Sequence, residues 1–94
     1  MLATIFMAFE SRMVKYENLS SNKLDQDFGK ALQRLRKLNN LSQEELSFRV
    51  GMHRTYISQL ERGLKSPSLR TIGKLCKELK LSLSQLMQEV EKLL

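Results

Sequence analysis

The fold is decided by residues 42–63, SQEELSFRVGMHRTYISQLERG. Ser42 is followed three residues later by Glu45, which is the spacing of a capping box. In that arrangement the hydroxyl and the carboxylate each accept a hydrogen bond from a free backbone N–H at the start of a helix. The pattern therefore predicts a helix over 43–50, with Gly51 available for the left-handed conformation at its end.

A second short helix is predicted over 53–62, because apolar residues resume at a helical spacing and Gly63 can end it. Only a short connection that contains Gly51 separates the two helices, and a turn that short makes them cross steeply. This is helix-turn-helix geometry. The crossing needs a small side chain at Ser47, and the inward apolar positions that hold it are Leu46, Val50, Ile57 and Leu60.

Outside this stretch, apolar residues recur at spacings of three and four and never alternate over the length of a strand. A helix is predicted over 25–39, with a buried stripe of Phe28, Ala31, Leu32, Leu35 and Leu38. After a Ser66-Pro67-Ser68 loop, another helix is predicted to bury Leu69, Ile72, Leu75, Cys76 and Leu79. A last helix, capped by Ser82, carries Leu83, Leu86, Met87, Val90, Leu93 and Leu94. The predicted fold is all-α.

Composition limits what the chain can be. With 94 residues it is expected to form one domain, too short for a two-domain enzyme. One cysteine, Cys76, and one histidine make no set of ligands for structural zinc, and no metal or cofactor is expected. The single cysteine fits the reducing cytoplasm. A net charge of +6 favours a polyanionic partner such as nucleic acid or an acidic membrane.

Residues 1–24 differ from the rest and are predicted to form an amino-terminal arm. The apolar run from Leu2 to Phe9 is too short to cross a bilayer and lacks the basic region and cleavage site of a signal peptide. No membrane association is expected. The arm is predicted to pack on the body of the protein or on a second subunit through Ile5, Phe6, Met7 and Phe9. A polar linker is predicted over 18–23.

The central stretch resembles the Cro/repressor, or XRE, family of DNA-binding domains. The resemblance is carried by 42–46 (SQEEL), Gly51 and 53–63 (HRTYISQLERG), and it extends over about 28–86. HRTYIS followed by ERG is most similar to the controller proteins of restriction–modification systems. The family implies a five-helix, lambda-repressor-like domain over 25–94, usually a homodimer on a two-fold symmetric operator. Ser47 departs from the alanine usual in the family, so its hydroxyl needs a local partner, such as the carbonyl one turn back.

If the helix over 53–62 enters a major groove, its outward face reads the bases. Four polar residues lie opposite Ile57 and Leu60, and we expect these to contact base edges: Arg54, Thr55, Ser58 and Gln59. Arginine can donate two hydrogen bonds to guanine, glutamine pairs with adenine, and hydroxyl side chains contact either base or the thymine methyl. The alternative is that they are solvated surface residues.

Four further residues are expected to contact phosphates: Gln43, His53, Arg62 and Lys65. Gln43 begins a helix, where free N–H groups and the helix dipole attract an anion. Loop cations such as Lys65 are alternatively only solvated. The resemblance also implies a structural ion pair between Arg36 and Glu61, which holds two helices together.

The last helix, over 82–94, has a longer apolar stripe than a small domain needs, which predicts a homodimer interface at Leu83, Leu86, Met87 and Val90. Burial within the same chain is the alternative. The leading hypothesis is a sequence-specific transcriptional regulator of double-stranded DNA. An antitoxin-like or adaptor module with the same fold is the competing hypothesis. No enzymatic site is found, and no small-molecule effector is expected, since no room remains for a conventional sensing domain.

Overall fold

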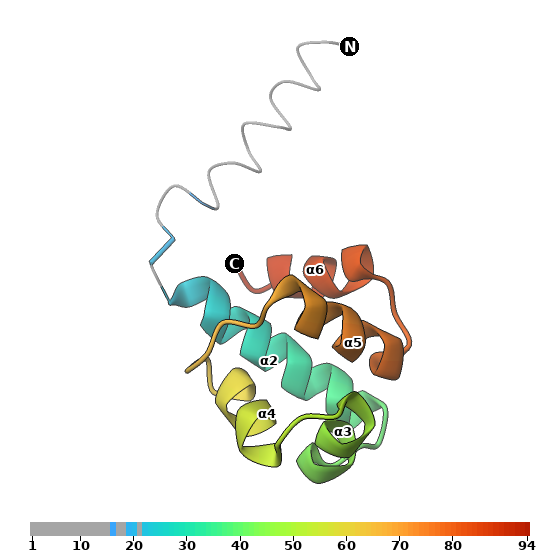
Figure 1. Ribbon diagram of the computed structural model, residues 1–94. Helices are drawn as coiled ribbons and strands as arrows, with labels where there is room; N and C mark the ends of the chain where they lie inside the picture. The colour runs from blue at the N-terminus through green and yellow to red at the C-terminus, as the bar shows by residue number, and fades with distance from the viewer. Residues whose placement is uncertain (1–15, 17–18, 21) are drawn as a thin grey trace.

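The computed structural model describes residues 16, 19–20 and 22–94. In this part of the chain the structure is all-α, without strands (Figure 1). Its five helices are α2 (Lys23–Leu38), α3 (Gln43–Val50), α4 (Arg54–Glu61), α5 (Leu69–Leu79) and α6 (Leu83–Glu91). The predicted bounds of α3 are confirmed, and α2 starts two residues earlier than predicted. None of these helices is long and apolar enough to cross a membrane.

The helix ends follow from local sequence. Ser42 and Ser82 both form complete capping boxes, with Glu45 and Gln85 as the reciprocal partners. At the other end of α3, Gly51 has φ +71°, and the backbone N–H of Met52 donates to the carbonyl of Ser47 at 2.9 Å. This is a Schellman ending, which needs a left-handed residue and therefore favours glycine. The ends of α3 are thus fixed by Glu45 inside the helix and by Ser42 and Gly51 directly beside it.

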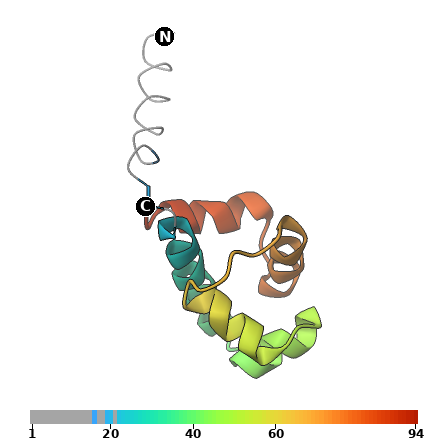
Figure 2. The ribbon, with the colours of Figure 1, turned by 60° about the vertical axis from the view of Figure 1, so that its left-hand side comes forward.

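The five helices pack around one core. Helix α2 packs against α4 and α6, while α3 packs against α4 and α5, and α5 against α6. Figure 2 shows α3 and α4 together at one end of the molecule and α6 at the other, next to the start of α2. The core contains Phe28, Ala31, Leu32, Leu41, Leu46, Val50, Ile57, Leu60, Leu75, Cys76, Leu79, Leu86 and Val90.

Two residues predicted to be buried are exposed. Leu38, at the end of α2, is 66% exposed, and Leu69, at the start of α5, is 74% exposed. Both lie at helix ends, where a side chain can have the spacing of the core stripe without a neighbouring helix opposite it. Near the end of α2, the buried side chain is instead that of Arg36.

A glycine in α2 sets how closely α2 and α4 approach. A Cβ at Gly29 would overlap the carbonyl oxygen of Leu60 and lie 2.5 Å from that of Glu61. These are backbone atoms and cannot turn aside as a flexible side chain can. The backbones of α2 and α4 are therefore in direct contact at Gly29.

Most of the amino-terminal arm lies outside the described residues, including Ile5, Phe6, Met7 and Phe9 and much of the polar linker. Within the described part, the hydroxyl of Tyr16 donates to Oε2 of Glu91 at 3.1 Å. Nζ of Lys23 bonds Oδ2 of the buried Asp27 at 2.6 Å and the carbonyl of Leu93 at 3.4 Å. The beginning of the described chain is thus held beside the end of α6.

Candidate nucleic-acid interface

Helix α4 has one buried and one open side. Ile57 and Leu60 are fully buried against the core. With 3.6 residues per turn, the four predicted base-contacting residues lie on the opposite side. Arg54 and Thr55 are exposed, and Ser58 and Gln59 are half-buried. The structure therefore brings all four together on one face of α4, with none of them in the core.

The start of α4 is fixed by His53, which the sequence had placed inside the helix and which is its N-cap. Nδ1 of His53 accepts a hydrogen bond from the backbone N–H of Thr55 at 3.1 Å. A ring nitrogen that accepts carries no proton, so the proton of the neutral imidazole is on Nε2. The ring is exposed and can donate outward through that nitrogen.

The small residue that the sequence predicted at the crossing of α3 and α4, Ser47, is buried. Ser47 is 4% exposed, and its hydroxyl donates to the carbonyl of Glu44 at 2.7 Å. This is the local partner expected for a hydroxyl at that position. The buried polar group is satisfied within α3, so no donor or acceptor of a neighbouring helix is needed.

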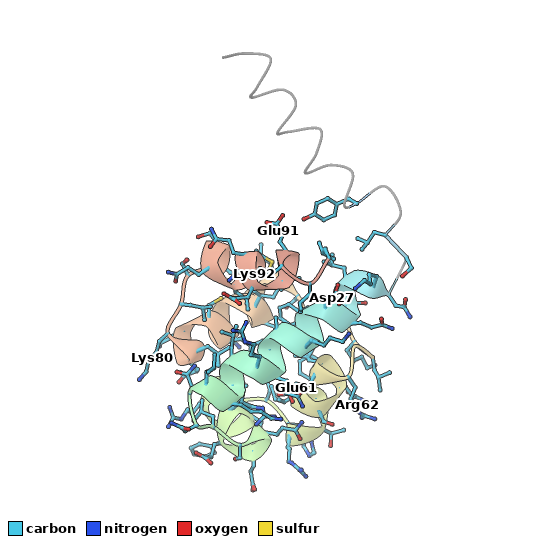
Figure 3. The ribbon with its side chains drawn as sticks, turned by 180° about the vertical axis from the view of Figure 1, so that it is seen from behind. Asp27, Glu61, Arg62, Lys80, Glu91 and Lys92 are labelled. Atoms are coloured by element: carbon cyan, nitrogen blue, oxygen red, sulfur yellow. The ribbon has the colours of Figure 1, made fainter. Side chains whose placement is uncertain are left out.

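A buried ion pair locks α4 to α2. Nε of Arg36 lies 2.6 Å from Oε2 of Glu61, and Nη2 lies 3.0 Å from Oε1. Nη1 of Arg36 donates to the carbonyl of Leu41 at 2.8 Å. In Figure 3, Glu61 lies inside the molecule, whereas its neighbour Arg62 lies at the edge. The pair implied by the family resemblance is thus present.

Gln43 joins this network, which the sequence did not indicate. Its Nε2 donates to Oε1 of Glu61 at 3.0 Å, so the first residue of α3 lies beside the last residue of α4. One amide N–H of Gln43 is used in this bond, and the amide has a second one. Arg62 and Lys65, which follow α4, are both exposed, and Nε of Arg62 contacts the carbonyl of Ser58 at 3.4 Å.

Charges around α4 favour an external anion. Helix α3 begins with Glu44 and Glu45, which suit the positive end of a helix, whereas α4 begins with Arg54 and has no acidic residue in its first turn. A cation there is disfavoured by the helix dipole unless an anion lies nearby. Among the described residues, the four ion pairs all involve α2 or α6, and none includes Arg54, Arg62 or Lys65.

Comparison with known proteins agrees with this geometry. A family model described as helix-turn-helix matches residues 32–86. The chain belongs to the helix-turn-helix family.

Relatives within this helix-turn-helix family include controller proteins, as the sequence predicted. The chain is 45% identical to the control protein C.BamHI of Bacillus amyloliquefaciens over 53 residues, which are 55% of this chain and 65% of that protein. It is 38% identical to the control protein C.MunI of a Mycoplasma species over 66 residues, 69% of this chain and 89% of that protein. The match to C.BamHI thus spans just under two thirds of that relative's length.

Among solved structures, the restriction–modification controller protein C.AhdI of Aeromonas hydrophila is similar, with a TM-score of 0.64 and 39% identity. The similarity covers 66% of this chain and 94% of that one. The resemblance to the XRE type of the helix-turn-helix family and to its controller proteins is therefore confirmed.

The predicted dimer residues of this helix-turn-helix chain divide into two groups. Leu86 and Val90 are 0% and 2% exposed within a single chain, so they belong to its own core and have no surface to offer a partner. Helix α6 packs against α2 and α5. The apolar spacing within one helix does not show which other helices cover it. Leu83 is 46% exposed and Met87 is half-buried. Only these two retain surface for an interface.

Sequence reasoning missed the roles of Gly29, Gln43 and Asp27 in this helix-turn-helix fold. A glycine inside a predicted helix was the available signal for Gly29. Nothing in the spacing pointed to the bond from Gln43 to Glu61, nor to the burial of Asp27, whose Oδ1 has no hydrogen-bond partner among the described residues. The described residues contain no cluster of three or more His, Cys, Asp or Glu side chains able to hold a metal ion.

Proposed function

We propose that this chain, a DNA-binding transcription regulator of the helix-turn-helix family, binds a two-fold symmetric operator as a homodimer in the cytoplasm. Helix α4 enters the major groove of each half-site. The observation that carries the proposal is the two-sided character of α4. Its inner face is fully buried, while its outer face presents Arg54, Thr55, Ser58 and Gln59.

Each of these side chains suits a base edge. Arg54 donates two hydrogen bonds to O6 and N7 of guanine, and Gln59 pairs with N6 and N7 of adenine. Thr55 and Ser58 contact bases through a hydroxyl, and Thr55 also offers a methyl group to thymine. Arg54 lies at the amino-terminal end of α4, the part of a recognition helix that reaches base edges in this motif.

Phosphate contacts orient the reading helix. His53 donates through Nε2, Gln43 donates through the amide N–H that Glu61 does not use, and Arg62 and Lys65 follow the other end of α4. These contacts carry no sequence information but fix the register of α4 on the duplex. The hydrogen bond from Gln43 to Glu61 fixes the phosphate-binding amide relative to α4, because Glu61 is the last residue of that helix.

The second subunit packs on an exposed apolar surface. Leu69, Leu83 and Met87 keep apolar area at the surface, and Met87 also lines a groove of about 220 Å³ between α2, α5 and α6. We assign the dimer interface to these three residues in place of Leu86, which is fully buried, and Val90, which also lines this groove but is only 2% exposed. A two-fold dimer that reads consecutive turns of DNA places its two α4 helices about 34 Å apart.

Selection of bound duplexes from random oligonucleotides tests the proposal. The wild-type chain should select a two-fold symmetric site, and Arg54→Ala should lose its preference at one position in each half-site. Discrimination at that position should fall by about 1 to 3 kcal/mol. Lys30→Ala, on the exposed side of α2, is the matched control and should leave the selected sequence unchanged.

Three outcomes are decisive against parts of this proposal. Uniformly weaker binding by Arg54→Ala, with the same selected site, would assign Arg54 to the phosphates. Selection of a non-symmetric site by a monomer would refute the dimer. A chain that binds no DNA and co-purifies with a stoichiometric protein partner would favour the antitoxin-like module instead.

A further inference from the structure

A track of cations continues from the end of α4 along α5. Between Glu61 and Glu78 the sequence contains no acidic residue and five basic ones: Arg62, Lys65, Arg70, Lys74 and Lys77. All five are exposed. None takes part in an ion pair among the described residues, whereas Lys23, Arg34, Arg36 and Lys92 are each paired with a carboxylate on α2, α4 or α6.

The last three members of the track share one face of α5. Arg70, Lys74 and Lys77 are spaced by four and three residues, so their side chains lie one above another along the helix. They point away from the core positions Leu75 and Leu79. At 1.5 Å per residue, the row is about 10 Å long.

Helix α3 contributes a further cation to this face. Lys74 and Lys77 line a shallow groove of about 220 Å³ together with Arg49 of α3, and its other lining residues are Val50 and Glu78. Glu78 is half-buried and is the only carboxylate in this lining. The groove therefore brings three cations from two helices around one concave surface.

The arrangement is costly for an isolated chain. Arg70 is the second residue of α5, whose first turn has no acidic residue, so its charge opposes the helix dipole. Like charges spaced by three or four residues also repel each other along a helix. An external polyanion removes both penalties.

We infer that Arg70, Lys74 and Lys77 of α5, with Arg49 of α3, form a second phosphate-binding ridge that contacts the DNA backbone outside the base pairs read by α4. The inference rests on the proposed function, because the same duplex is bound by both surfaces. Phosphates follow one another along a strand every 3.4 Å or so of helix axis, so a row about 10 Å long faces about three of them. No acidic residue interrupts the sequence between the end of α4 and this row. This favours the continuous phosphate backbone of the DNA bound by α4 as the partner, over a separate acidic protein.

The test compares two pairs of neutral substitutions in the full chain. Lys74→Gln/Lys77→Gln removes two charges from the ridge. Lys30→Gln/Lys37→Gln removes two charges from the exposed side of α2 and is the matched control. Binding of a selected operator and of an unrelated duplex is measured between about 50 and 200 mM salt. Circular dichroism verifies that both variants are folded.

The ridge variant should show a weaker salt dependence than the wild type on both duplexes. Each phosphate bound by a cation adds about 0.9 to the slope of log affinity against log salt, so a variant that binds two fewer phosphates should show a roughly tenfold smaller fall in affinity over this salt range. The effect should be equal on the operator and on unrelated DNA, because phosphates carry no sequence information. The control variant should keep the wild-type slope.

The inference is overturned if the ridge variant keeps the wild-type slope, or loses no more of it than the α2 control. Failure of the proposed function gives a different result, since the wild-type chain would then select no sequence at all. The contribution of the ridge would still be measurable on the unrelated duplex. A slope that falls only on the operator would also contradict a backbone contact and would assign the two lysines to base recognition.

Discussion

The guanidinium of Arg36 and the carboxylate of Glu61 form a two-pronged ion pair between α2 and α4, with nitrogen–oxygen distances of 2.6 and 3.0 Å. Both side chains are almost completely buried. The hydrogen bonds to Glu61 raise the pKa of Arg36 further above its ordinary value, which favours the charged guanidinium. The carboxylate also binds Gln43, which joins the first residue of α3 to the last residue of α4.

Removal of one partner should be far more damaging than loss of a surface pair. Arg36→Met leaves the carboxylate of Glu61 buried with Gln43 as its remaining side-chain donor, and we expect the free energy of unfolding to fall by about 3 to 5 kcal/mol. Urea unfolding measures this change. Arg34→Met is the control, because its pair with Glu89 is at the surface and is worth less than about 1 kcal/mol.

The double variant Arg36→Met/Glu61→Leu should recover much of the lost stability, because no unpaired charge remains buried. If the double variant is less stable than Arg36→Met alone, the destabilisation comes from poorer packing and not from the orphaned carboxylate. If Arg34→Met and Arg36→Met lose the same stability, burial of the inner pair has no energetic consequence.

Two glycine-to-alanine substitutions should have opposite effects. The alanine Cβ of Gly29→Ala would overlap the backbone of α4 at Leu60 and Glu61, and we expect a loss of about 1 to 3 kcal/mol as the helices separate. Gly73→Ala, in the exposed side of α5, meets nothing within 4 Å and should gain about 0.5 to 1 kcal/mol from the better helix propensity of alanine. Thermal unfolding of both variants gives the comparison. A stabilised Gly29→Ala would show that α2 and α4 are not in direct backbone contact.

Acid should remove the stabilisation that Glu89 provides through its ion pairs with Lys92 and Arg34. Lys92 and, to a smaller extent, Arg34 hold the pKa of Glu89 below its ordinary value of 4.5. A carboxylate with a lowered pKa in the folded state stabilises the protein above its unfolded pKa, and this contribution disappears as the pH falls through the folded pKa. The stability difference between the wild type and Glu89→Gln should therefore shrink as the pH falls below the ordinary pKa of 4.5 and through the folded pKa of Glu89. A difference that stays constant over this range would mean that Glu89 acts only through packing.

The thiol of Cys76 should react only when the protein opens. It is buried in the core, and burial raises its pKa above the ordinary 9.0. Little thiolate is present near pH 8, and the sulfur is covered, so alkylation should be slow in buffer and fast in denaturant. Since Cys76 is the only cysteine, mass spectrometry gives an unambiguous reading. Alkylation in buffer at the rate of a free cysteine would show that α5 is not packed as described.

The sequence predicted elements best where the determinants are local. The ends of α3 follow from Ser42, Glu45 and Gly51, which act within a few residues, and the bounds of that helix were predicted correctly. The inward direction of Ile57 and Leu60 likewise follows from helical spacing alone. The same spacing predicts the outward position of Arg54, Thr55, Ser58 and Gln59 on α4.

Predictions that depended on distant neighbours were less successful. Spacing gives the direction in which Leu38, Leu69, Leu86 and Val90 point, but not whether another helix lies opposite them. The first two are exposed and the last two lie in the core of the chain. The bond from Gln43 to Glu61 joins residues 18 positions apart, and the close approach at Gly29 involves the backbone of α4. Such contacts depend on the tertiary structure, which the helical spacing of apolar residues does not specify.

In α4, different residues support the helix and face outward, and this separation has an evolutionary consequence. Support for the helix comes from Ile57, Leu60 and Glu61, while the side chains of Arg54 and Thr55 form no hydrogen bond with the rest of the described chain. Substitutions at the outer positions therefore leave the scaffold intact. A lineage carrying this domain is free to diversify its target preference one outer position at a time, without first acquiring compensating changes elsewhere.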